Sequence, residues 1–305
     1  MLKERAKDIS LVVELGRSCN SMCADCVMRG SVQKDHNMWR LISGESYPFL
    51  PLGDRHITFK QLRDLLESYP KAIAERIEAI RFAGLWCEPT LAEDLPRMVR
   101  WLLDFTREMK CELGVISNGF NLPEGPYNEQ EMKDYFVRYY GFDPSLGCPD
   151  NFYLTISVDK YHLASFLKIR KCRGAEPIDA KHSYQEKIHN LIEFAIASGF
   201  GPQIIINTTV PDNVDPAVAI RNLRSKYNIA DGILVHPLRL SIYCQSQAGL
   251  THAVNLMGGT ESPSKGARTV FLQKHSGMPF IFGTISDQAS HTRPIPADRY
   301  LIDLL

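Results

Sequence analysis

The sequence has no excess of charge of either sign, no long apolar run and no internal repeat. Its 305 residues contain 35 Lys and Arg against 35 Asp and Glu, so the overall charge does not indicate a nucleic-acid or anionic-membrane partner. No apolar run approaches the roughly 18 residues of a membrane span, and the first residues lack the apolar core of a signal peptide. We therefore expect a cytoplasmic protein that binds neither nucleic acid nor membrane.

The sequence also lacks the closely spaced cysteine pairs of a disulfide framework. Of its eight cysteines, five are scattered, and disulfides are rare in the cytoplasm. The scattered cysteines are Cys87, Cys111, Cys148, Cys172 and Cys244. We interpret most of them as inert buried thiols, although a thiol beside a substrate radical could also return a hydrogen atom.

The other three cysteines lie on one short segment that follows the apolar run 9–15. Cys19, Cys23 and Cys26 can converge as thiolates on an iron–sulfur cluster, and three ligands leave one iron of a four-iron cluster open. A structural zinc site usually requires four ligands with paired spacings, which His36 does not supply. The pattern favours a catalytic cluster, with a zinc-binding module and a non-catalytic Fe–S electron carrier or sensor as alternatives.

Six short apolar runs are typical of buried strands, and helical signals separate several of them. The runs are 9–15, 78–83, 113–116, 152–158, 203–207 and 233–237. The helical signals are a capping box at Thr58–Gln61, a helix from about Leu95, a helix over 189–197 stopped by Gly199, and a helix from Asp215 to Tyr227. Such alternation predicts an α/β fold with a parallel sheet covered by helices, whose functional loops lie at the carboxyl ends of the strands.

The C-terminal part differs in composition from the rest of the chain. From about Leu240 it is rich in Gly, Ser and Pro. We expect a core over residues 1–240 and an extension over 241–305 that packs on this core and covers one mouth of the sheet. A long segment of this kind inside a compact domain is commonly a lid or a binding element.

The spacing Cys-x3-Cys-x2-Cys after a first strand resembles the signature of the radical S-adenosylmethionine (radical SAM) enzymes. The resemblance spans roughly residues 9–240. It implies a partial (β/α)6 barrel of parallel strands with helices outside. It also implies one [4Fe–4S] cluster bound by Cys19, Cys23 and Cys26, with S-adenosylmethionine as the second cofactor.

The segment after the second predicted strand resembles the Gly-Gly-Glu-Pro stretch of that family. Gly84, Glu88 and Pro89 match it, and the resemblance implies that they surround the methionine amino group; Cys87 stands where the family usually has glycine. A carboxylate and a proline at this place are also ordinary at a helix start. In the cysteine segment, Asp25 replaces a common aromatic residue, and we assign it no catalytic role.

Three later segments follow the same order as in the family. Asn118 lies in Ser-Asn-Gly, which resembles the Thr-Asn-Gly turn after the third strand. Ser157 and Asp159 resemble the ribose-contacting segment, and Asn207 lies where some members contact the cofactor. The simpler alternatives are a generic turn at Asn118, a helix cap at Ser157 or Asp159, and a hydrogen-bonded buried amide at Asn207.

The resemblance also implies an activity. The amino and carboxylate groups of S-adenosylmethionine would chelate the open iron. An electron from a donor such as flavodoxin or ferredoxin would then cleave the sulfonium and yield a 5′-deoxyadenosyl radical. We expect this radical to act on a small metabolite in specialised or cofactor biosynthesis, with a peptide substrate as the alternative. The outcome could be epimerisation, dehydration, rearrangement or carbon–carbon bond formation, and no catalytic side chain is assigned.

Overall fold

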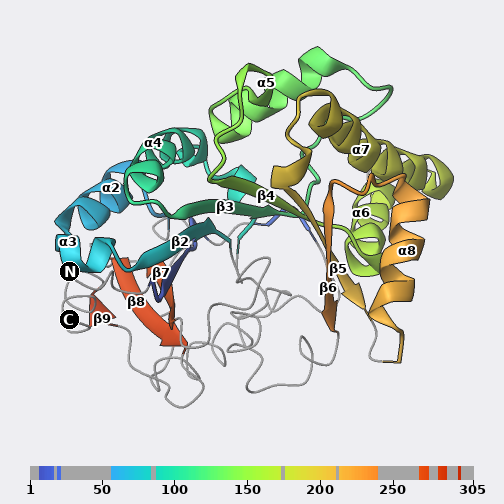
Figure 1. Cartoon of the computed structure of the whole chain (residues 1–305). Coiled ribbons are helices and arrows are strands. Elements are labelled where there is room, and N and C mark those ends of the chain that lie inside the picture. The colour runs from blue at the N-terminus through green and yellow to red at the C-terminus, as the bar shows by residue number, and fades with distance from the viewer. Residues whose placement is uncertain are drawn as a thin grey trace.

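The computed structural model describes residues 7–16, 19–21, 56–83, 87–172, 176–210, 213–239, 268–274, 281–286 and 295–296. Their strands form one sheet with the order β6-β5-β4-β3-β2-β1-β7-β8-β9 (Figure 1). The strands are β1 Ile9–Val13, β2 Ile77–Phe82, β3 Glu112–Ser117, β4 Phe152–Ser157, β5 Ile204–Val210, β6 Leu234–Arg239, β7 Arg268–Lys274, β8 Ile281–Ser286 and β9 Ile295–Pro296. All six predicted strands are therefore confirmed, each to within two or three residues.

The first six strands pair in parallel throughout, which confirms the predicted α/β fold with a parallel sheet. Within the described chain the sheet is open, because β6 and β9 stand at its two ends. The C-terminal strands were not predicted. β7 adds to the sheet in parallel beside β1, while β8 and β9 continue it in antiparallel fashion.

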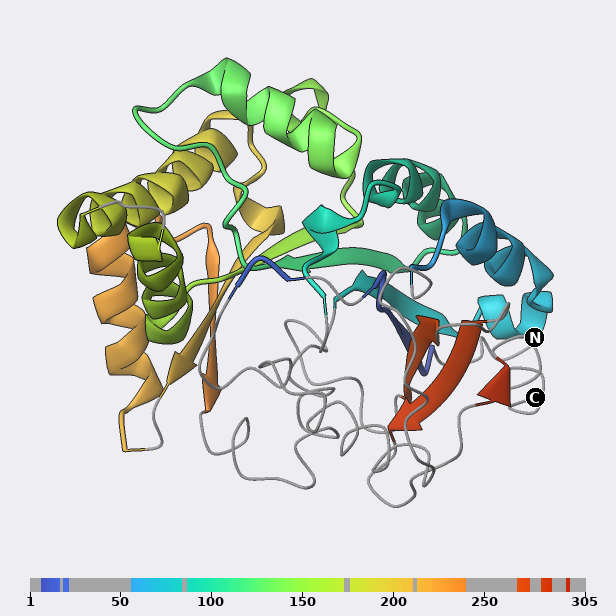
Figure 2. The ribbon, with the colours of Figure 1, turned by 180° about the vertical axis from the view of Figure 1, so that it is seen from behind.

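The helices lie between the strands in the chain and follow one another along the outer side of the curved sheet (Figures 1 and 2). The α-helices are α2 Phe59–Ser68, α3 Lys71–Ala74, α4 Leu95–Glu108, α5 Glu129–Tyr140, α6 Lys160–Cys172, α7 Pro177–Ala197 and α8 Pro216–Tyr227. Three short 3-10 helices are η2 Pro89–Leu91, η3 Pro144–Leu146 and η4 Gly201–Gln203. No described helix combines the length and apolarity needed to cross a bilayer.

Local sequence explains where the predicted helices begin and end. The capping box of α2 is complete, since Thr58 accepts from Gln61 N and the Gln61 side chain accepts from Thr58 N. Asp215 caps α8 by accepting from Ala217 N, as expected. The helix predicted over 189–197 begins much earlier, at Pro177. Its first half escapes the prediction because the buried side chains there include Ala180, Ser183 and Lys187, which interrupt the apolar stripe.

Successive side chains of each strand point to opposite faces of the sheet. One face carries apolar side chains such as Leu11, Ile80 and Leu113, which belong to the core shared with the helices. The other face carries polar groups. There the guanidinium of Arg81 in β2 donates to Ser10 Oγ in β1 at 2.6 Å. The second face, called the polar face below, therefore carries hydrogen-bonding side chains that would be costly to bury in an apolar core.

Candidate functional site

Parallel pairing brings the carboxyl ends of the first six strands to the same edge of the sheet. Cys19 follows β1 on the described segment 19–21, and Glu88, Asn118 and Asp159 follow β2, β3 and β4. The remaining predicted residues of this region, Cys23, Cys26 and Gly84, lie outside the described residues. Within the described part of the chain no three Cys, His, Asp or Glu side chains are grouped as metal ligands, so the predicted cluster set stays a prediction.

Glu88 is the buried centre of the site, with 4% of its surface exposed. Its Oε1 accepts from Thr90 Oγ1 at 2.7 Å and from Ser117 Oγ at 2.8 Å. Its Oε2 accepts from the backbone N–H of Asn118 at 2.8 Å. Burial raises the pKa of Glu88, while these hydrogen bonds act in the opposite direction. The carboxylate therefore joins the loop after β2 to the turn after β3, and Pro89 begins η2 directly behind it.

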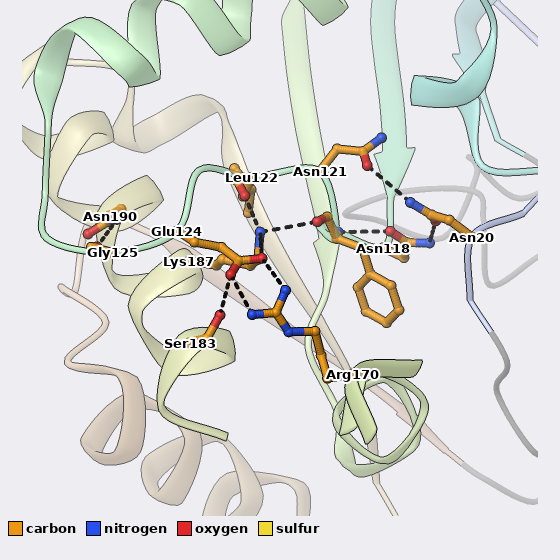
Figure 3. A network of polar contacts seen from close by, with 11 residues as sticks. Asn20, Asn118, Asn121, Leu122, Glu124, Gly125, Arg170, Ser183, Lys187 and Asn190 are labelled. Atoms are coloured by element: carbon orange, nitrogen blue, oxygen red, sulfur yellow. Dashed lines mark hydrogen bonds and ion pairs between the residues drawn. The ribbon is translucent and has the colours of Figure 1, made fainter. Parts of the chain in front are cut away.

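Asn118 connects this turn to the cysteine segment. Its Nδ2 donates to Asn20 Oδ1 at 2.7 Å (Figure 3). The same nitrogen lies 3.8 Å from Cys19 Sγ. Its Oδ1 accepts from Phe120 N at 2.9 Å, which fixes the orientation of the amide. The side chain is 6% exposed. Asn118 thus does more than form the generic turn that its sequence context also allows.

Two further asparagines that the sequence did not single out, Asn20 and Asn121, complete the connection. Asn20 Nδ2 donates to Asn121 Oδ1 at 3.1 Å, and Asn121 Nδ2 donates to Thr90 Oγ1 at 2.9 Å. Since Thr90 donates to Glu88 and Glu88 accepts from Asn118, the hydrogen bonds form a closed ring. The ring consists of Asn20, Asn118, Glu88, Thr90 and Asn121, and it ties together the segments after β1, β2 and β3.

Hydrogen-bond donors surround the one described cysteine of the triplet. Ser21 N lies 3.4 Å from Cys19 Sγ, on the same sulfur that Asn118 Nδ2 approaches. Ser21 Oγ is also 3.0 Å from Ser165 Oγ in α6, which docks the segment against a second element. N–H groups directed at a sulfur stabilise its thiolate form, the form in which cysteine binds iron. This donor set fits a cluster ligand.

Asp159 makes structural contacts at the start of α6. Its Oδ1 accepts from His162 N at 2.9 Å and lies 2.9 Å from His162 Nδ1, while its Oδ2 accepts from Thr209 Oγ1 at 2.7 Å. Burial acts to raise the pKa of Asp159, but the charge and hydrogen bonds of His162, together with Thr209, outweigh it and lower the pKa to about 2. These contacts are those of the capping alternative, and they tie β4 to β5.

Ser157 and Asn207 occupy neighbouring positions on the polar face of the sheet. Ser157 of β4 lies opposite Asn207 of β5, which lies opposite His236 of β6. Asn207 is 8% exposed, and its backbone C=O accepts from Val158 N at 2.7 Å. Burial lowers the pKa of His236, so the row carries neutral hydrogen-bonding groups. The predicted residues Ser157 and Asn207 are therefore adjacent.

Cys87 lies between the end of β1 and the buried carboxylates. Burial raises the pKa of its thiol, and the charges of Glu14 and Glu88 add to this effect against the backbone N–H groups of Gly16 and Leu15. Burial likewise raises the pKa of the more distant Cys111 to about 11 and of Cys148 to about 12. All three are therefore protonated near neutral pH, as expected of inert thiols.

Neither a comparison with protein-family models nor a search of curated proteins finds a match to this chain.

Proposed function

We propose that this protein is a radical SAM enzyme with one [4Fe–4S] cluster bound by Cys19, Cys23 and Cys26. In this proposal the curved parallel sheet is the partial (β/α)6 barrel of that family. The main support is the closed ring of hydrogen bonds, because it joins three segments that the sequence independently assigns to the cofactors. Parallel pairing alone would bring these loops to one edge of the sheet, but it would not require the motif residues Glu88 and Asn118 to bond each other.

Chemical fit gives further support. Cys19 Sγ has two N–H neighbours, which suits a thiolate ligand rather than an apolar thiol. Outer hydrogen bonds of this kind orient a ligand and tune the cluster that it holds. Side chains on the polar face of the sheet provide hydrogen-bonding groups for a second cofactor or a substrate.

The residues proposed to surround S-adenosylmethionine are Gly84, Glu88, Pro89, Asn118, Ser157, Asp159 and Asn207. The described contacts suggest two kinds of role among them. Glu88 and Asp159 already accept several hydrogen bonds each, which favours a role in positioning the neighbouring backbone. Ser157 and Asn207 present neutral polar groups at one level of the sheet, which favours direct contact with a ligand.

When bound, the two cofactors supply hydrogen-atom abstraction from an unactivated carbon. The chain's own part is to bind, to orient and to exclude water. We propose a small metabolite as the substrate, flavodoxin or ferredoxin as the electron donor, and the cytoplasm as the location.

Anaerobic reconstitution with iron and sulfide tests the proposal. We expect an absorbance band typical of a [4Fe–4S] cluster, and 5′-deoxyadenosine after addition of dithionite and S-adenosylmethionine. Cys23→Ala should abolish both, whereas the matched control Cys148→Ala should retain both, because Cys148 precedes β4 away from the ring.

The alternatives predict different results in the same experiment. Bound zinc without acid-labile sulfide would indicate a zinc-binding module. A cluster whose spectrum does not respond to S-adenosylmethionine would indicate an electron carrier or sensor. Either result would refute the proposed activity.

A further inference from the structure

A buried lysine of α7 contacts the segment that carries Asn118 and Asn121, two members of the hydrogen-bonded ring. Lys187 in α7 has a side chain only 3% exposed, and its ammonium lies 3.2 Å from Glu124 Oε1. It also donates to the backbone carbonyl of Phe120 at 3.2 Å and to that of Leu122 (Figure 3). A lysine ammonium has three N–H donors, so each has a partner. A buried charge is tolerated when it is paired and hydrogen-bonded in this way.

Glu124 joins a second helix to the same unit. Arg170 Nη2 in α6 lies 3.0 Å from Glu124 Oε2, and Ser183 Oγ in α7 donates to that oxygen at 2.9 Å. The charge of Lys187 and these hydrogen bonds lower the pKa of Glu124 against the opposing effect of burial. The carboxylate is therefore ionised near neutral pH and clamps α6 and α7 together.

All of these contacts converge on the short segment 118–125 (Figure 3). Its central carbonyls are held by Lys187, and its last residue, Gly125, accepts from Asn190 Nδ2 at 2.9 Å. The ring of Phe120 packs edge-to-face against Phe166 of α6, with centroids 5.3 Å apart. The same segment carries Asn118 at its start and Asn121 between Phe120 and Leu122, and both asparagines contact Asn20.

We propose that Lys187 is a positioning residue for the cofactor site. By fixing two carbonyls of segment 118–125, it holds Asn118 and Asn121 where they dock the cysteine segment. The link to a cofactor rests on the proposed function, but the docking itself does not. If the ion pair only stabilised the fold, its loss would affect stability without a selective effect on residues 19–21.

Amide hydrogen exchange on the cluster-free protein separates these possibilities. Lys187→Met removes the ammonium and keeps an unbranched chain, whereas Lys187→Arg keeps the charge. Arg76→Met is the matched control, because it removes another partly buried ion pair, to Asp8, at the opposite ends of β1 and β2. If Lys187→Met does not fold, Arg170→Met loosens the same unit through a more exposed residue.

In Lys187→Met we expect exchange in peptides covering 118–125 and 19–21 to be about tenfold faster, as for the loss of one buried hydrogen bond. Lys187→Arg should restore part of the protection, and Arg76→Met should leave both peptides as in the wild type. Faster exchange in 118–125 alone, in neither peptide, or equally in Arg76→Met would overturn the inference.

The reconstituted protein provides the second readout. Its affinity for S-adenosylhomocysteine, which is not cleaved, should fall about tenfold in Lys187→Met and stay unchanged in Arg76→Met. If the wild type binds neither cluster nor analogue, the proposed function fails, while the exchange experiment still decides the role of Lys187. If the wild type binds the analogue and Lys187→Met binds it equally well, the cofactor part of the inference fails.

Discussion

The side-chain amide of Asn118 lies 2.7 Å from the side-chain oxygen of Asn20. This hydrogen bond connects the turn after β3 to the segment that carries Cys19, and its direction is fixed on both sides. Asn20 donates in turn to Asn121, and Asn118 accepts from Phe120 N. Neither amide can be reversed without opposing two donors or two acceptors, so the contact specifies one arrangement of the two segments.

Asn118→Asp should weaken retention of the proposed cluster. The substitution keeps the shape of the side chain but places an oxygen against Asn20 Oδ1 and Cys19 Sγ. Loss of an outer contact of a metal ligand typically costs about 10- to 100-fold in affinity. Iron release to a chelator from the reconstituted protein measures the effect.

Asn128→Asp provides the control for this substitution. Asn128 caps α5 by accepting from Gln130 N and Glu131 N, and aspartate caps a helix equally well. Its iron release should match that of the wild type. Equal retention in Asn118→Asp and wild type would contradict a role for Asn118 at the cysteine segment.

Glu88→Gln should destabilise the protein by about 1–3 kcal/mol, because a buried donor is left without an acceptor. Oε1 and Oε2 each face a backbone N–H, of Thr90 and of Asn118 respectively. A glutamine therefore places its NH2 group against a donor in either orientation. Urea unfolding measures the loss, and Glu67→Gln on the exposed surface of α2 should change stability far less. An unchanged urea midpoint for Glu88→Gln would show that the buried contacts contribute little.

Asp159 should contribute stability that depends on pH in the acid range. Its pKa is lowered from the ordinary 3.8 to about 2 in the folded protein, so its contribution is complete above about pH 5 and is lost as the pH falls through 2. The shift corresponds to about 2 kcal/mol for this side chain, which is 5% exposed. The difference in unfolding free energy between wild type and Asp159→Asn should therefore shrink between pH 5 and pH 2.5. Parallel pH profiles would argue against the assigned ion pair.

Gly141 and Gly199 make a matched pair for testing close packing of the backbone. Both have positive φ, +79° and +70°, but an added Cβ at Gly141 would lie 2.3 Å from the carbonyl oxygen of Pro96, whereas Gly199 has nothing within 4 Å. Gly199→Ala should cost about 1–2 kcal/mol from backbone strain alone. Gly141→Ala should add about 1–3 kcal/mol, since the end of α5 must move away from α4. Similar thermal midpoints for the two variants would contradict this contact.

The sequence predicts the six parallel strands well because each is a short apolar run flanked by loop residues. The three later strands are harder to find, since Thr269, Gln273 and Lys274 interrupt the apolar character of β7. α5 was not predicted, although its signal is present in the sequence. Met132, Tyr135, Phe136 and Tyr140 recur at helical spacing after the cap at Asn128, and all four are buried.

The site was predictable only in part. Glu88, Asn118 and Cys19 could be selected because the motifs follow successive strands, and these residues do meet. Asn20, Asn121 and Lys187 could not be selected, because an asparagine in a loop indicates only a turn and a lysine in a helix usually faces solvent. Their importance depends on partners far away in the chain, such as Asn20 with Asn121 and Lys187 with Phe120.

The position of β1 has a consequence for the order in which the protein is made. This strand pairs on one side with β2 and on the other with β7, where Ile9 lies opposite Arg268. During synthesis one edge of the N-terminal strand therefore stays unpaired until β7, near the end of the chain, has been made. Such an edge is open to wrong partners, and late pairing of distant segments is slow. The strand that leads directly to Cys19 is thus paired on both edges only after β7 has been made.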